Sequence, residues 1–124
     1  MSTGITVTCR VAKPPGLNQF KRMSKWAYKR ARDDWQLRLS LVTRGLKIAE
    51  PCHLVYTVHT SLWMDWDNAA SSAKLPLDAL VRLGVLPDDN TKWITSMDIR
   101  QDKCPRKDVG FTMLFTPISL EDEV

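Results

Sequence analysis

Several features that identify common protein classes are missing from this sequence of 124 residues. No apolar run approaches the roughly 18–20 residues needed to cross a bilayer, so we expect no membrane contact. The first residues lack the basic start and apolar stretch of a secretory signal, and we expect a cytoplasmic protein. With no internal repeat or low-complexity segment, residues 1–124 are predicted to form one domain, with a disordered acidic tail at 119–124.

Clustered metal ligands of the zinc type are also missing. Cys9, Cys52 and Cys104 are far apart and form no Cys-x-x-Cys pair, while His53 and His59 stand in an apolar, alternating stretch. A zinc site or a disulfide framework needs ligands close together, so we expect ordinary structural thiols. Nothing in the sequence calls for a small-molecule cofactor.

Acidic residues are scarce in residues 1–50, and in residues 51–124 they outnumber the basic residues. Residues 1–50 carry eleven Lys or Arg and three acids, whereas residues 51–124 carry seven Lys or Arg and eleven acids. The net charge of +4 hides this asymmetry. A polyanionic partner together with a bound cation accounts for both halves, and the solvated faces of an ordinary protein are the alternative.

Hydrophobic patterning predicts strands and helices in mixed order. Ser24 is a typical N-cap for the first main helix, and Pro76 predicts that a second helix begins separately near Lys74. The predicted strands are 4–12, 52–62, 91–100 and 109–117, and the predicted helical regions are 25–44 and 67–83. This order indicates an α+β domain with a single small mixed β-sheet and two main helices.

Two acidic pairs are the most informative feature of the sequence. Asp65 and Asp67 follow a predicted strand, and Asp88 and Asp89 precede the next one. If those strands are neighbours, we expect both pairs near one edge of the sheet. Carboxylates there would hold Mg²⁺, with Mn²⁺ as a substitute, and Lys74 would stabilise charge on a phosphate. Taken singly, each pair also suits helix capping or a turn.

The order Asp65-x-Asp67-Asn68, Lys74, Asp78-Ala-Leu80 and Asp88-Asp89 resembles the RusA family of Holliday junction resolvases, which are often encoded by phages. The segments Pro14-Pro-Gly-Leu-Asn18 and Lys25-Trp-Ala-Tyr-Lys29 are similar to further parts of that family. The resemblance covers roughly residues 5–117. It departs from the family at Trp63 and Met64, where arginines are common, and in the longer spacing from Asp67 to Lys74.

The resemblance implies a RusA-like, Mg²⁺-dependent endonuclease that resolves four-way junctions or other branched DNA by paired symmetric cuts. It implies that Asp65, Asp67 and Asp89 bind metal, that Lys74 is catalytic, and that Asp88 is an adjacent acid. It also implies a homodimer, which matches the near two-fold symmetry of a four-way junction. The alternatives are a non-catalytic branched-DNA-binding protein on the same fold and a less selective flap or fork nuclease.

Basic residues of the first half are the candidates for DNA contacts, because lysine and arginine neutralise phosphates. With the polar Asn18, which alternatively caps a turn, the candidates are Lys13, Asn18, Lys21, Arg22, Lys25, Lys29, Arg30 and Arg32. We expect Trp26 and Tyr28 either to stack on exposed bases of branched DNA or to belong to the core. Trp66 is a wedge at the junction or packs over the site.

Overall fold

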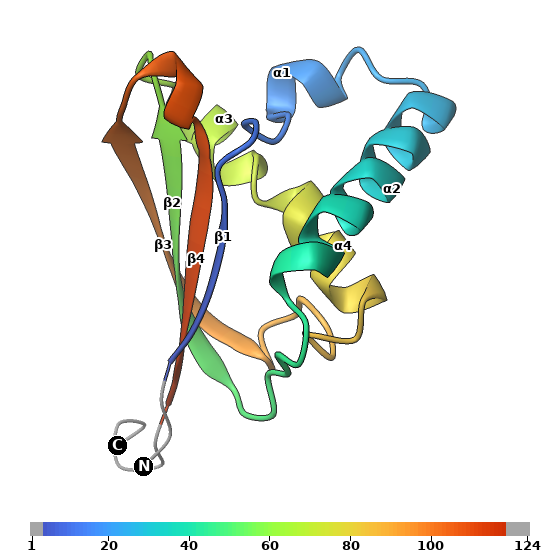
Figure 1. Cartoon of the computed structure of the whole chain (residues 1–124), viewed down its shortest axis with the longest axis vertical. Coiled ribbons are helices and arrows are strands. Elements are labelled where there is room, and N and C mark those ends of the chain that lie inside the picture. The colour runs from blue at the N-terminus through green and yellow to red at the C-terminus, as the bar shows by residue number, and fades with distance from the viewer. Residues whose placement is uncertain (1–3, 119–124) are drawn as a thin grey trace.

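The computed structural model describes residues 4–118 and has one sheet covered by helices on one face (Figure 1). The strands are β1 (Ile5–Cys9), β2 (Cys52–Thr60), β3 (Ile94–Lys103) and β4 (Gly110–Pro117). The helices are α1 (Leu17–Phe20), α2 (Lys25–Val42), α3 (Trp66–Ser71), α4 (Lys74–Arg82) and the short 3-10 turn η1 (Arg106–Asp108). This confirms the α+β class and the single mixed sheet, and the expected disorder at 119–124 lies outside the described residues.

The sheet has the order β1-β4-β2-β3. β4 is antiparallel to both β1 and β2, whereas β2 and β3 run parallel. A parallel pair needs a crossover connection, and α3 and α4 provide it. Within residues 4–118, no helix is both long and apolar enough to cross a membrane.

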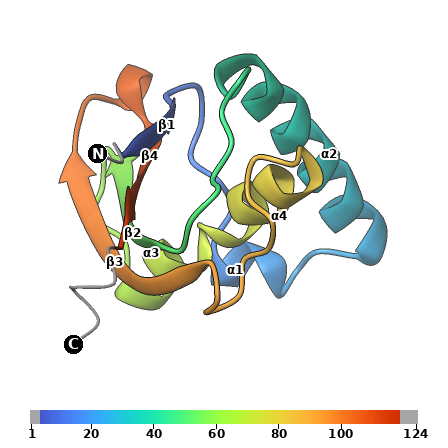
Figure 2. The same cartoon turned by 90° about the horizontal axis from the view of Figure 1, so that it is seen from below.

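Alternation along the strands directs one set of side chains toward the helices. On β2, Leu54, Tyr56 and Val58 are fully buried, and on β4 Phe111 and Phe115 are fully buried. Helices α2 and α4 pack on this side, as the view from below shows (Figure 2). The opposite face of the sheet carries no helix among the described residues, and its side chains are mostly polar.

The helix boundaries follow local sequence signals. The Ser24 side chain accepts a hydrogen bond from the Ala27 amide, as expected of an N-cap. The predicted break before Pro76 is confirmed, since α3 ends at Ser71 and α4 begins at Lys74. Pro76 lies in the first turn of α4, where its missing amide hydrogen costs no helical hydrogen bond. Gly84 follows the helix with φ of 77°, the left-handed conformation that glycine adopts readily.

Candidate functional site

The two motifs that suggested the RusA family contact each other. Leu17 donates its amide to Ser71 Oγ at 2.7 Å, and Asn18 donates its amide to Asn68 Oδ1 at 3.1 Å. Gly16 permits this approach, because a Cβ at that position would lie 2.8 Å from the Asn68 carbonyl oxygen. The Pro-Pro-Gly-Leu-Asn segment therefore positions the start of α3, which carries the first acidic pair.

Asp65 and Asp67 are exposed at the start of α3. Asp65 is the N-cap residue, but its side chain makes no capping hydrogen bond. Asp67 is in the first turn, and its Oδ1 accepts the Asn68 amide at 2.9 Å. Asp67 therefore makes the kind of hydrogen bond to a neighbouring amide that an acid with a structural role makes, whereas Asp65 makes no capping hydrogen bond.

The loop between β2 and α3 presents two tryptophans to solvent on a well-anchored backbone. The Gln101 side chain bonds both the amide and the carbonyl of Met64, at 2.8 and 2.9 Å. Trp63 and Trp66 remain 63% and 61% exposed. Lys103 Nζ lies 6.0 Å from the centre of the Trp63 ring. The described fold thus leaves most of the Trp66 ring uncovered.

Lys74 and Asp78 lie on α4 beside Tyr28 of α2. The Lys74 ammonium is 5.7 Å from the centre of the Tyr28 ring, and the Tyr28 hydroxyl donates to Asp78 Oδ2 at 2.5 Å. Partial burial, followed by the hydrogen bond to Asp78 and its charge, raises the pKa of Tyr28. Tyr28 is thus held between the helices, packed against Phe20 with ring centres 5.9 Å apart.

Asp78 shares a hollow with the second acidic pair. The hollow has a volume of about 260 Å³ and is lined by Arg32, Asp78, Val81, Arg82, Asp88 and Asp89. The Asp89 residue is exposed overall, yet partial burial of its carboxyl raises its pKa. A hydrogen bond with Asp88 and the charges of Asp78 and Asp88 raise that pKa further. These carboxylates repel one another, and a cation beside them would relieve the repulsion.

The two acidic pairs lie toward opposite ends of the sheet, so the expectation that they share one edge is wrong. β2 and β3 are neighbours, which was the condition for that expectation, but they run parallel, with Thr60 at the end of β2 paired to Lys103 at the end of β3. Residues 65–67 follow the end of β2, whereas residues 88–89 precede the start of β3. Figure 1 shows α3 beside the upper end of the sheet and the loop after α4 near its lower end.

This separation reduces the number of carboxylates that one chain can place around a metal ion. Among residues 4–118, no group of three or more His, Cys, Asp or Glu side chains is arranged to hold a metal. The predicted set Asp65, Asp67, Asp88 and Asp89 is therefore not brought together in the described part of one chain. Each pair alone presents two carboxylates.

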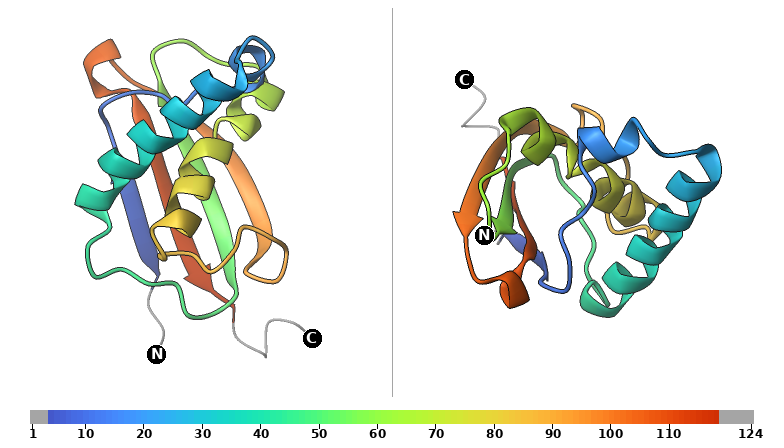
Figure 3. Two further views of the ribbon diagram at one scale, coloured as in Figure 1. Left: turned by 90° about the vertical axis from the view of Figure 1, so that its right-hand side faces the viewer. Right: turned by 90° about the horizontal axis from the view of Figure 1, so that it is seen from above.

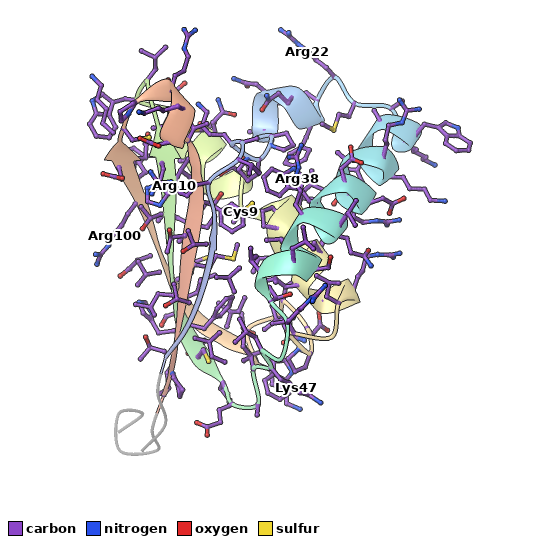
Figure 4. The ribbon with its side chains drawn as sticks, viewed as in Figure 1. Cys9, Arg10, Arg22, Arg38, Lys47 and Arg100 are labelled. Atoms are coloured by element: carbon purple, nitrogen blue, oxygen red, sulfur yellow. The ribbon has the colours of Figure 1, made fainter. Side chains whose placement is uncertain are left out.

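The candidate DNA-binding residues divide into two groups. Lys13 lies beside the end of β2, where its Nζ donates to Thr60 Oγ1 at 3.0 Å. Lys21 and Arg22 follow α1, and Figure 4 shows Arg22 directed away from the fold at the end of the molecule that carries α1. The view from above places α1 near α3 (Figure 3). The second group lies along α2 and consists of Lys25, Lys29, Arg30 and Arg32.

The open face of the sheet carries a polar network that the sequence did not predict. His59 is 8% exposed, with Nδ1 2.7 Å from Asp102 Oδ2 and Nε2 2.7 Å from Thr112 Oγ1. Thr112 Oγ1 is in turn 3.3 Å from Thr8 Oγ1, so the network joins all four strands. Alternation places His59 on this face, but its partners depend on strand register, which the sequence does not reveal. These contacts give both nitrogens of the buried His59 ring a hydrogen-bond partner and link side chains of neighbouring strands.

Comparison with known proteins adds no relative. No protein-family model matches the chain, and no curated protein matches it. The link to the RusA family thus stays a prediction from motifs. The structure brings the Pro14–Asn18 and Asp65–Asn68 segments into contact, which was not predicted from the sequence.

Proposed function

We propose that the protein is a metal-dependent endonuclease for branched DNA, acting at the end of the molecule formed by α1, α3 and the loop before α3. The contact between the Pro14–Asn18 segment and α3 carries this proposal, because it joins the two motifs that resemble the RusA family. Exposed carboxylates, exposed tryptophans and basic side chains are found together there. Basic side chains bind phosphates, aromatic rings stack on unpaired bases, and carboxylates bind the metal ion of a metal-dependent nuclease.

A three-carboxylate metal site does not fit the described residues of one chain, but a smaller site does. Mg²⁺ commonly binds proteins through one or two carboxylates, with water and substrate phosphate completing its shell. Asp65 and Asp67 meet that requirement, and Mn²⁺ accepts the same ligands. When bound, such an ion supplies a more acidic water and a Lewis acid for phosphodiester hydrolysis.

The remaining predicted residues act from α4 and the loop after it. Lys74 is exposed at the start of α4, where its charge attracts a phosphate of the substrate. Asp88 and Asp89, with Asp78, form a second carboxylate group at the far end of α4. Within residues 4–118 these three carboxylates are not arranged to hold a metal ion, so the proposed reaction does not depend on an ion there.

The decisive experiment incubates the protein with a synthetic four-way junction, with Mg²⁺ or with a chelator. We expect symmetric nicks that depend on the metal, and none on linear duplex of the same sequence. Asp67→Asn should abolish the nicks while keeping or tightening junction binding, because it removes negative charge near phosphates. Asp34→Asn, at an exposed acid on α2, is the matched control and should cleave like the wild type.

Two further outcomes separate the alternatives. Junction binding without nicks under any divalent metal would favour the non-catalytic DNA-binding protein. Equal cleavage of flaps, forks and four-way junctions would favour the less selective nuclease. Cleavage by Asp67→Asn at the wild-type rate would exclude the assigned site in either case. Asp89→Asn then tests the second carboxylate group: unchanged cleavage removes that group from the reaction.

A further inference from the structure

The basic residues of the second half of the chain are concentrated in one short segment. Residues 51–124 contain seven Lys or Arg, and four of them lie within residues 100–107, namely Arg100, Lys103, Arg106 and Lys107. All four are exposed. The segment includes the end of β3 and the start of η1. The DNA contacts predicted from the sequence include none of these residues, because they all come from the basic first half.

Hydrogen bonds tie the connection between β3 and β4 to the rest of the sheet. The Cys104 amide donates to the Thr60 carbonyl at 2.9 Å, which fixes the start of the connection to the end of β2. Arg10, just after β1, donates its Nε to the Asp108 carbonyl at 2.5 Å and so brings a further exposed cation to η1. We call the following four residues the η1 surface: Arg10, Lys103, Arg106 and Lys107.

Cations outnumber acids on this part of the molecule. The acids within residues 100–108 are Asp102 and Asp108, against four Lys or Arg in the same stretch and Arg10 beside it. Asp102 Oδ2 lies 2.7 Å from Nδ1 of His59 on the open face of the sheet. The η1 surface therefore presents net positive charge, which attracts a polyanion.

The η1 surface lies at the same end of the molecule as the candidate site. Lys103 Nζ is 6.0 Å from the centre of the Trp63 ring, so the η1 surface adjoins the loop before α3. Helix α3, which follows this loop, contacts α1, and the exposed Lys21 and Arg22 come directly after α1. We call Lys21 and Arg22 the α1 surface. Figure 1 shows η1 and α1 at the upper end, and the view from above shows them on different sides of it (Figure 3, right).

We propose that the η1 surface binds the second duplex arm of a branched DNA whose first arm lies on the α1 surface, and that it thereby distinguishes branched from linear DNA. This inference rests on the proposed function. A linear duplex stays straight over the size of a small protein, since its persistence length is about 50 nm. The exposed rings of Trp63 and Trp66 stand in the loop between the two surfaces and keep a straight duplex from lying on both. At a branch the arms diverge, and unpaired bases there can stack on those rings.

The two surfaces should contribute differently to the two kinds of DNA. A linear duplex occupies one surface at a time, so the loss of one surface leaves the other available. A branched DNA occupies both, and linked contacts strengthen each other because the second forms within an existing complex. The loss of either surface should therefore weaken the binding of branched DNA far more than that of linear duplex.

The test measures binding to a labelled four-way junction and to a linear duplex by fluorescence anisotropy, with a chelator that prevents cleavage. Arg106→Gln with Lys107→Gln should lower affinity for the junction by about tenfold, and affinity for the duplex by no more than about twofold. The slope of log affinity against log salt should fall by about two for the junction, because each lost phosphate contact removes about 0.9. Lys21→Gln with Arg22→Gln should give the same pattern, and the combination of all four changes should weaken both DNAs.

A matched control removes one arginine and one lysine elsewhere. Arg44 and Lys47 are exposed in the loop after α2, and Figure 4 shows Lys47 at the lower end of the molecule. Arg44→Gln with Lys47→Gln changes the net charge by the same amount and should bind both DNAs like the wild type. Circular dichroism of every variant should match the wild type, since all the changed side chains are at the surface.

Several results would overturn the role of the η1 surface. Junction binding that Arg106→Gln with Lys107→Gln leaves unchanged excludes it, and so does an equal loss for the junction and the duplex. If metal-dependent nicks disappear in Asp67→Asn while the η1 variant binds the junction normally, the proposed function stands without this inference. If the η1 variant selectively loses junction binding but no metal supports nicks, the inference stands for a non-catalytic protein. A wild-type chain that binds neither DNA excludes both.

Discussion

At the scale of single residues, the loop before α3 combines exposure with a fixed backbone. The Gln101 side chain accepts a hydrogen bond from the Met64 amide and donates one to the Met64 carbonyl, which fixes the backbone between the two indoles. Trp63 and Trp66 are therefore presented in a defined position beside Asp65. An unpaired base at a branch point has a free aromatic face that can stack on such a ring.

Removing either indole should reduce binding to branched or single-stranded DNA. Stacking on an aromatic side chain is worth about 1–3 kcal/mol per base, so Trp63→Ala or Trp66→Ala should weaken binding by roughly tenfold. Fluorescence anisotropy with labelled DNA and a chelator measures this without cleavage. Leu62→Ala removes a neighbouring apolar side chain, 71% exposed but without a ring, and should have little effect. An equal loss in all three variants would argue against stacking.

The two tyrosines of the chain should both resist ionisation. Burial is the main cause that raises the pKa of Tyr28 and of Tyr56 above the ordinary value of 10.0. The pKa of each tyrosine is higher in the folded protein than in the unfolded chain. Each tyrosine therefore contributes its full stabilisation below its unfolded pKa, and this contribution is lost as the pH rises through the folded pKa. Ultraviolet titration should show no tyrosine ionising at its ordinary value until the protein unfolds. Asp78→Asn should lower the pKa of Tyr28 alone, and a shift in both tyrosines would contradict this assignment.

At the scale of elements, most helices and strands were predictable because their signals are local. Alternation of apolar residues marks β2, the serine before Lys25 marks the start of α2, and Pro76 marks the break between α3 and α4. Helix α1 was not predicted, because Pro14, Pro15 and Gly16 indicate a break. None of the four residues of α1 is fully buried, so no apolar pattern marks this helix. Its position depends on bonds to α3, which the local sequence does not encode.

The second main helix contributes to stability through its inner face. Leu80 is fully buried, so Leu80→Ala should reduce the free energy of unfolding by about 2–5 kcal/mol through lost burial and a residual cavity. Urea unfolding measures the change. Val11→Ala truncates an apolar residue that is 68% exposed and should change stability by less than about 0.5 kcal/mol. Similar losses in the two variants would mean that α4 is not part of the core.

At the scale of the whole molecule, strand direction limited the prediction of the site. The sequence correctly predicts an acidic pair after β2 and another before β3, but it does not predict that these two strands run parallel. Parallel pairing depends on contacts between distant residues, and it sends residues 65–67 and 88–89 to opposite ends. The contact between Asn18 and Asn68 was equally unpredictable from spacing, although the motifs that contain them were recognisable.

The pairing of β1 with β4 has a practical consequence for experiments on single molecules. Ile5 lies opposite Phe115, so the chain enters and leaves the sheet at one end, while Cys9 and Gly110 lie at the other, near the start of α3. A surface anchor attached through Ile5 or Pro117 would therefore lie at the end of the sheet opposite Trp63, Trp66 and the first acidic pair. Tethered DNA could then reach the end that carries the tryptophans unobstructed.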